Sequence, residues 1–486
     1  MRILLSFLCL IFISTSIFSQ NVGIGTSSPT EKLHVNGNIK VDTLKSDNIK
    51  MTSNAAEGKV LTSDASGNGS WQQLSAGNNV PAGAGFGSWG DCRMNSVSEY
   101  LPMTDTVSME SYAYGRSIAI AGNTALVGNP AKANAYVYNY DGTNWKLVQQ
   151  LRDPALSDTS GFGISVAISG DWALVGVPLA YVGENQWQGV ADLFHYNGSG
   201  WVFAQQIKDP SGTALDVFGF GIAISGDNLI VGSYLDDVNA SVDQGSACVF
   251  HYNGSSWVFV QKIIDGTGAT NDGFGVKVAI SGNLAVIASP FDDIGTNTDY
   301  GSVSLYKLNG ANWTLLKKMT DSTATISNTR FGTGLSITNG YLAIGAPWFG
   351  TETFSASDEQ RGIVNVYHYD GANWKFMEKI HASDSAHTSA FGSSISLSGD
   401  YMIIGEPSFS SRRPGPGVTG NRVGAADIYV RIGLHWQKVQ LLLDPGAMEI
   451  DGFGNVVAID GNNRRFIVGI PFYSGASGKV IFGRVN

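Results

Sequence analysis

The chain has 486 residues, of which 14 % are charged and 43 % hydrophobic, and it contains 61 glycines. This composition excludes an intrinsically disordered protein and favours an ordered β-rich fold with many turns. The formal net charge is −10, and the lysines and arginines are scattered along the sequence. Because binding to phosphate backbones needs a basic stripe, we expect no nucleic-acid partner.

The N-terminus is typical of a secretory signal peptide. Arg2 precedes an apolar run from Ile3 to Ile13, and small polar residues lead to a predicted cleavage site after Ser19. The run is too short to span a membrane comfortably, and no later segment is apolar and long enough to do so. We therefore expect residues 1–19 to be removed and the protein to be exported, to the cell surface, the medium or the periplasm. Cys92 and Cys248 would remain, unpaired.

Residues 20–77 form a separate β-rich segment. The stretches VGIGTSSPTEKLHVNGNIKV (22–41) and EGKVLTSDASGNGSWQQ (57–73) resemble the N-terminal head of tail-fibre-like bacterial surface proteins. Such heads often form trimeric stalks, so the resemblance leaves a homotrimer open as the assembly. The Gly/Ala-rich residues 78–95 are predicted to be a linker.

Residues 96–486 contain seven copies of one unit. Each copy begins with an aromatic-glycine pair, and successive pairs are 48 to 62 residues apart. A recurrence of this length indicates an array of supersecondary units. The pairs are Tyr114-Gly115, Phe162-Gly163, Phe218-Gly219, Phe274-Gly275, Phe331-Gly332, Phe391-Gly392 and Phe453-Gly454.

The pattern inside each unit predicts four antiparallel strands. Hydrophobic residues alternate with a period of two, a short SGD-like turn separates the first two strands, and an NG or DG turn separates the last two. Six copies carry a tryptophan at the start of the fourth strand, and its fixed spacing favours packing between units over a ligand platform. Four-stranded units of this length are the blades of a β-propeller. The fold class is therefore all-β, a seven-bladed propeller.

The seventh copy ends before its fourth strand. In the stretch SVSEYLPMTD (96–105), Met103 and Asp105 match Leu151 and Asp153, which stand at the end of a fourth strand in another copy. We expect this N-terminal strand to complete the last blade and close the ring, which removes an exposed sheet edge.

The opening Phe-Gly and a closing Gly-x-Pro, as in GVP (176–178) and GAP (345–347), resemble the FG-GAP repeat. This resemblance implies an integrin α-like propeller that serves adhesion or ligand binding. In calcium-binding FG-GAP blades a DxDxDG loop lies between the first two strands. Here that place holds only short turns such as Ser169-Gly170-Asp171, so we expect no integrin-type calcium site.

Carboxylates gather instead in the loops LDDVNASVDQG (235–245) and FDDIGTNTDYG (291–301). Turn capping by the acidic side chains explains them without a metal. We expect no tight metal site and no cofactor, but the sequence leaves open whether Asp236, Asp237, Asp292 and Asp293 bind calcium.

Nothing in the sequence indicates catalysis. His195, His251 and His368 occupy one slot in three different units, so they are not expected to meet at one ion. No GxSxG elbow, P-loop or Cys/His pair is present, and we expect the protein not to be an enzyme.

The loops that differ between units are the place to seek function. Loops between the second and third strands should emerge on one face of the propeller, and binding residues often lie on loops held by a rigid scaffold. We predict a binding site for an extracellular protein or glycan at exposed aromatic and arginine residues of this face, Tyr181, Trp187, Trp348, Phe349, Arg412 and Arg413. Three functions follow in order of preference: an adhesion or recognition module, a lectin, and a carbohydrate-active enzyme.

Overall fold

The computed structural model describes residues 113–321, 327–338, 340–349, 362–371, 373–382, 389–408, 424–444, 452–471 and 478–485, and the backbone of four short strands nearer the N-terminus. The chain divides into two compact units between Met94 and Asn95. In the first unit, β1 (Val22–Ile24) pairs in parallel with β2 (Leu33–Val35), and β3 (Lys59–Ser63) pairs antiparallel with β4 (Gly69–Gln73). The predicted signal peptide, linker and closing strand (96–105) lie outside the described residues.

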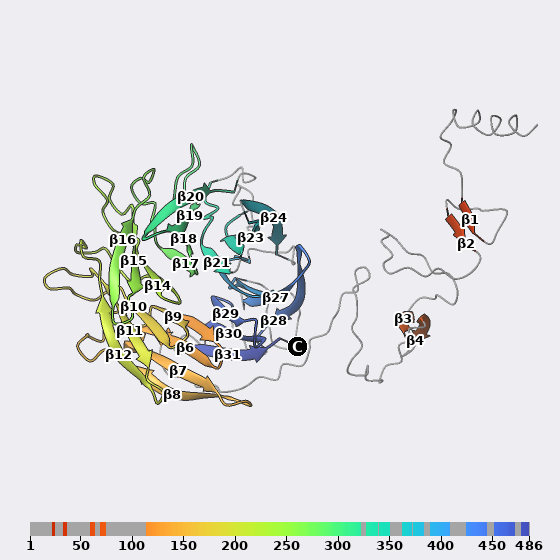
Figure 1. The fold of residues 1–486 in the computed structure, drawn as a ribbon, viewed down its shortest axis with the longest axis horizontal. Helices are drawn as coiled ribbons and strands as arrows, with labels where there is room; N and C mark the ends of the chain where they lie inside the picture. The colour runs from red at the N-terminus through yellow and green to blue at the C-terminus, as the bar shows by residue number, and fades with distance from the viewer. Residues whose placement is uncertain are drawn as a thin grey trace, which may run out of the picture. The chain divides into compact units, whose positions relative to one another are not determined.

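The second unit consists of seven antiparallel sheets, one for each copy of the repeat (Figure 1). The first four blades are β5 (Ile118–Ala121), β6 (Thr124–Asn129), β7 (Asn134–Tyr140) and β8 (Trp145–Leu151); β9 (Ser165–Ser169), β10 (Trp172–Val177), β11 (Val190–Tyr196) and β12 (Trp201–Ile207); β13 (Gly221–Ser225), β14 (Asn228–Ser233), β15 (Ser246–Tyr252) and β16 (Trp257–Ile263); and β17 (Lys277–Ser281), β18 (Leu284–Ser289), β19 (Ser302–Asn309) and β20 (Asn312–Met319).

The remaining blades follow the same order. They are β21 (Gly334–Thr338), β22 (Tyr341–Ala346), β23 (Ile363–Tyr369) and β24 (Trp374–His381); β25 (Ser394–Ser398), β26 (Tyr401–Glu406), β27 (Ala425–Ile432) and β28 (His435–Leu442); and β29 (Val456–Asp460), β30 (Arg465–Ile470) and β31 (Lys479–Arg484). A single 3₁₀ turn, η1 (Pro130–Lys132), follows β6 in the described part of the chain.

The seven sheets close into a ring. The first strand of each blade contacts the first strand of the next blade, and β29 of the last blade contacts β5 of the first. Figure 1 shows these strands, labelled β9, β17, β21 and β29, towards the centre of the propeller, with fourth strands such as β12 and β16 at its rim. The predicted seven-bladed β-propeller is therefore confirmed.

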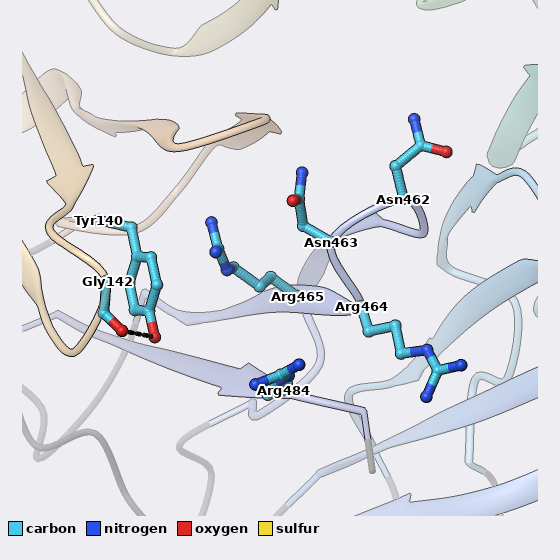
Figure 2. A pocket seen from close by; sticks show the side chains of 7 residues that line it. All are labelled: Tyr140, Gly142, Asn462, Asn463, Arg464, Arg465 and Arg484. Carbon is cyan, nitrogen blue, oxygen red and sulfur yellow. Dashed lines mark hydrogen bonds between the residues drawn. The ribbon is translucent and has the colours of Figure 1, made fainter.

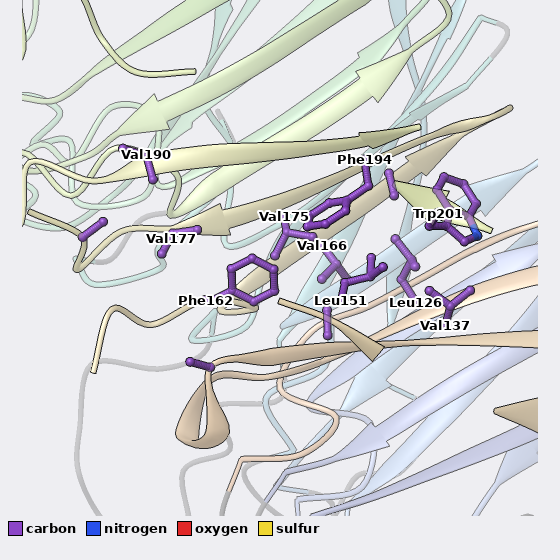
Figure 3. Close-up of a cluster of buried hydrophobic side chains, with 14 residues drawn as sticks. Leu126, Val137, Leu151, Phe162, Val166, Val175, Val177, Val190, Phe194 and Trp201 are labelled. Atoms are coloured by element: carbon purple, nitrogen blue, oxygen red, sulfur yellow. The ribbon is translucent and has the colours of Figure 1, made fainter. Parts of the chain in front are cut away.

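Each hydrophobic cluster lies between two neighbouring blades. The cluster in Figure 3 joins Leu126, Val137 and Leu151 of blade 1 to Phe162 and Trp201 of blade 2. The predicted packing role of the fourth-strand tryptophans is confirmed, because all six are at most 7 % exposed: Trp145, Trp201, Trp257, Trp313, Trp374 and Trp436.

The repeated glycines form the joints between blades. Gly163, from the aromatic-glycine pair of blade 2, has a φ of +89° and donates its backbone N–H to the carbonyl of Gly176 at 3.1 Å. A Cβ on Gly176 would lie only 2.0 Å from the carbonyl oxygen of Gly219 in the next blade. The two glycines recur because the backbones of adjacent blades approach too closely for a side chain.

One buried carboxyl makes stability depend on pH. Burial raises the pKa of Asp192, on β11, to about 7, although Gln206 donates a hydrogen bond to it at 3.0 Å. The folded state therefore holds this proton more tightly than the unfolded chain does. The contribution of Asp192 to stability is intact below pH 4 and is lost as the pH rises towards 7.

We expect Asp192→Asn to raise the free energy of unfolding by roughly 2–4 kcal/mol at pH 8, because the variant carries no charge at this position. The gain should vanish at pH 4, where the unfolded chain also begins to bind the proton. Thermal unfolding of both proteins at pH 4, 6 and 8 measures the difference. An equal shift at all three values would show that the carboxyl is ionised in the folded protein throughout.

Candidate recognition face

Three loops on one face of the propeller share a single conformation. They connect the second and third strands of blades 2, 3 and 4 and span residues 180–189, 236–245 and 292–301. Each contains one isolated antiparallel bridge, Val182 with Asn185 in the first loop and the equivalent pairs in the other two. The glycine that ends each loop donates its N–H to the carbonyl of the first loop residue at 2.9–3.1 Å. We call this side of the propeller the recognition face.

Most acidic residues of these loops make ion pairs or hydrogen bonds within the protein. The Lys262 ammonium lies 2.6 Å from Oδ2 of Asp236 and 2.8 Å from Oδ2 of Asp209, which belongs to the preceding blade. The Lys318 ammonium likewise lies 2.7 Å from Oδ2 of Asp292 and 2.8 Å from Oδ2 of Asp265. A lysine ammonium thus takes the place between two carboxylates that a cation would need.

The second aspartate of each pair shapes its loop. Asp237 Oδ1 accepts the backbone N–H of Asp243 at 2.9 Å, and Asp293 Oδ1 accepts that of Asp299 at 2.8 Å. Burial, with a smaller effect of the nearby Asp237 charge, raises the pKa of Asp243. These contacts support the turn-capping interpretation of the acidic loops.

Blade 2 replaces the loop carboxylates with aromatic side chains. Tyr181 stands at the position of Asp237, and Trp187 at that of Asp243. Their side chains are 58 % and 40 % exposed. Trp187 has a φ of +53°, which is uncommon for a non-glycine residue, and its carbonyl accepts the N–H of Val217 at 3.0 Å. Two exposed aromatic side chains are therefore held on a fixed backbone.

Trp348 and Phe349 of blade 5 differ in their surroundings. Trp348 is 42 % exposed, and the Arg330 guanidinium lies 5.8 Å from its ring centre. Phe349 is half-buried against the hydrophobic cluster between blades 4 and 5, and the Lys379 ammonium lies 4.7 Å from its ring. Trp348 thus remains available to a ligand, whereas Phe349 anchors its loop.

The structure does not gather the predicted residues into one small site. Tyr181 and Trp187 belong to blade 2 and Trp348 to blade 5, with two blades between them in the order of the ring. Arg412 and Arg413 lie outside the described residues. Contact with both aromatic groups would require a ligand that spans much of the recognition face.

Sequence reasoning missed residues that follow the end of the second strand. Phe291 of blade 4 occupies the position of Trp348, and the Arg330 guanidinium lies 5.2 Å from its ring. Tyr234 of blade 3 lies one position earlier, where blade 4 has Pro290, and contacts Phe220, with ring centres 4.7 Å apart. Comparing the two residues after the second strand in all copies would have identified these aromatic residues.

Two cations lie close to the first strands. Lys277 lies on the first strand of blade 4, at the position that Ser165 occupies in blade 2 and Ser394 in blade 6. Its surroundings lower the pKa of Lys277 by desolvation, and the charge of Arg116 from blade 1 lowers it further. These cations add a positive contribution to the potential near the axis of the propeller.

The histidines that share a slot lie apart, as expected. His195, His251 and His368 belong to the separate sheets of β11, β15 and β23. His195 packs on Trp172 with ring centres 4.6 Å apart, and His251 Nδ1 lies 3.1 Å from Asn228 Oδ1. Within the described ranges, no three His, Cys, Asp or Glu side chains form a group that could hold a metal ion.

Comparisons with known proteins identify the repeat. A family model described as FG-GAP repeat matches residues 201–250, 257–306 and 374–426. Each match begins at a fourth-strand tryptophan and ends in the third strand of the next blade, so it spans one joint between blades. No curated protein matches the chain.

Solved structures also resemble the chain. One is a functionally unknown protein from Desulfotomaculum acetoxidans DSM 771, with 13 % identity and a TM-score of 0.39, over 69 % of this chain and 86 % of that one. Among the residues whose structure is described, no helix has the length and apolar character needed to cross a membrane.

Proposed function

From the premise that this chain is a seven-bladed β-propeller of FG-GAP repeats, we propose that it is an exported, non-enzymatic adhesion or recognition module. The recognition face binds an extracellular protein or another surface ligand. The signal-peptide pattern of residues 1–19 supports export, and FG-GAP repeats are typical of extracellular proteins.

The observation that carries this proposal is the substitution of aromatic for acidic side chains in one of three loops with the same backbone. Blades 3 and 4 keep aspartates that fold back on their own loop, whereas Tyr181 and Trp187 of blade 2 project exposed ring surface. Burying such rigid aromatic surface at an interface is favourable and costs little side-chain entropy. Apolar surface kept exposed on an ordered loop supports a binding role.

A lectin is the second candidate. Exposed tyrosine and tryptophan rings on a fixed loop suit the apolar faces of sugar rings, and Trp348 with Arg330 offers a second surface of this kind. This candidate differs from the first in its ligand and uses the same residues.

Binding should be measured with the full chain on a broad glycan array in EDTA, then on a panel of immobilised extracellular-matrix proteins with calcium present. We expect saturable binding that the double variant Tyr181→Ala/Trp187→Ala weakens at least tenfold, since central aromatic contacts contribute about 2 kcal/mol or more. Binding to one glycan class would select the lectin, and binding to a protein the adhesion module.

The matched control is Leu147→Ala/Val148→Ala, which removes two exposed apolar side chains from the rim strand β8. It should bind as the unchanged protein does. Equal binding by the Tyr181/Trp187 variant would refute the site, and catalytic turnover of a bound glycan would refute the non-enzymatic function.

A further inference from the structure

A pocket of about 380 Å³ lies where blade 7 meets blade 1, on the side of the propeller opposite the recognition face. This short-turn face carries the turns between the first and second strands and between the third and fourth. Figure 2 shows the lining side chains, Arg464, Arg465, Arg484, Asn462, Asn463 and Tyr140. Three arginines in one pocket are unexpected in a chain with a net charge of −10.

Arg464 ends a turn that is longer than its counterparts, and Arg465 begins the strand that follows it. Two residues separate β9 from β10, whereas four residues, 461–464, separate β29 from β30. Asp460 fixes this turn against blade 1, because its Oδ2 accepts the backbone N–H of Gly122 at 2.9 Å and the side-chain amide of Asn463 at 2.7 Å. The backbone that carries Arg464 and Arg465 is therefore held by both blades.

Arg465 is held in place by uncharged partners. Its guanidinium lies 3.8 Å from the ring centre of Tyr140, close enough for a cation–π contact. Its Nη1 donates to Asn123 Oδ1 at 2.7 Å and to the carbonyl of Gly122 at 3.3 Å. None of these partners is a carboxylate, and Figure 2 shows the guanidinium directed towards Tyr140.

Arg464 and Arg484 are exposed, and neither has an ion-pair partner within the described part of the chain. Asp460 is 6 % exposed, and its carboxylate already accepts hydrogen bonds from Gly122 and Asn463. Asp141, in the hairpin that borders the pocket, pairs with Lys146 at 2.7 Å. Among the residues that the structure describes, the acidic groups near the pocket thus do not neutralise its positive charge.

We propose that this pocket binds an anionic sugar, through a carboxylate or sulfate group held by Arg484 beside the fixed Arg465, with Arg464 adding positive charge to the pocket lining. Guanidinium groups bind such planar or tetrahedral oxyanions with paired hydrogen bonds. The asparagine side chains of Asn462 and Asn463 supply amide groups suited to sugar hydroxyls. The pocket volume is within the range of small-ligand sites. The protein would then have a second binding site, independent of the recognition face.

The test is calorimetric titration of the full chain with three tetrasaccharides: a heparin-derived sulfated one, a hyaluronan-derived one that carries only carboxylates, and a neutral one of N-acetylglucosamine. We expect an acidic tetrasaccharide to bind and the neutral one not to bind. The stronger of the two acidic ligands identifies the oxyanion. Arg464→Gln/Arg484→Gln should raise the Kd of that ligand at least tenfold, and added salt should raise the Kd for the unchanged protein.

The charge-matched control is Lys317→Gln/Lys375→Gln, which removes two exposed lysines from blades 4 and 5. Its Kd should equal that of the unchanged protein, and its loss of binding would show a general charge effect. Absence of binding by either acidic ligand, equal binding of the neutral one, or an unchanged Kd in the arginine variant would each overturn the proposal. Equal binding of inorganic sulfate alone would overturn the recognition of a sugar.

Discussion

Lys262→Met should lower the free energy of unfolding by about 3–5 kcal/mol at pH 7. The ammonium lies between Asp209 and Asp236, whose side chains are 0 % and 5 % exposed. Burial alone would lower the pKa of Lys262, but the hydrogen bonds and charges of the two aspartates outweigh it and raise the pKa. Methionine has a similar length and no charge, so two buried carboxylates would face each other without a counter-ion.

Denaturant unfolding at pH 7 and pH 4 measures this loss. We expect the difference between variant and unchanged protein to shrink at pH 4, where protonation of the uncovered carboxylates relieves their repulsion. A loss of the same size at both values would mean that packing of the lysine stem, and not its charge, stabilises the joint.

Two further substitutions separate the charge from the hydrogen bonds. Lys262→Gln introduces the residue that blade 2 has at this position, Gln206, whose amide donates a hydrogen bond to Asp192. Because glutamine can still donate to a carboxylate, Lys262→Gln should lower the free energy of unfolding less than Lys262→Met does. Lys375→Met removes an exposed lysine paired with Asp370, and an exposed pair contributes less than about 1 kcal/mol. If Lys375→Met cost as much as Lys262→Met, burial of the carboxylates would not be the reason.

The sequence predicted the repeated parts of the fold because their pattern is local. An aromatic-glycine pair opens each copy, and a two-residue turn and a tryptophan follow at short range in the first six; every described sheet follows that order. The closing strand at 96–105 stays a prediction. The Lys262 contacts were not predicted, because Asp209 and Asp236 come from different blades, and only the ring brings them to one ammonium.

The candidate sites were predicted less well than the fold. Exposed aromatic loops could be selected by composition, and Tyr181 and Trp187 are indeed exposed. Which loops face each other depends on the order of blades in the ring, so the separation from Trp348 was not visible in the sequence. The arginine pocket combines a long turn near residue 462 with a hairpin near Tyr140, more than 300 residues away.

Gly176→Ala should destabilise the joint between blades 2 and 3 by about 3 kcal/mol. Its new Cβ would lie 2.0 Å from the carbonyl oxygen of Gly219 and 2.1 Å from Oγ of Ser165, which itself donates to that carbonyl at 2.7 Å. Relief of the overlap requires one blade to move away from the next and breaks this hydrogen bond. Denaturant unfolding of the full chain measures the loss.

The matched control for this prediction is Gly170→Ala, in the turn between β9 and β10. Gly170 has a φ of +55° and no atom within 4 Å of its would-be Cβ, so only the left-handed backbone opposes alanine, at about 1 kcal/mol. A larger loss from Gly170→Ala than from Gly176→Ala would show that backbone conformation, and not the close approach of blades, accounts for the repeated glycines.

Blade 4 already has Ala288 at the position of Gly176, and its first strand has Lys277 where blade 2 has Ser165. Blades 3 and 5 keep Gly232 and Gly345 although their first strands have glycine in place of that serine. A Cβ on either would lie 1.9–2.0 Å from a carbonyl oxygen of the next blade, which supports the close approach of the backbones as the reason for glycine.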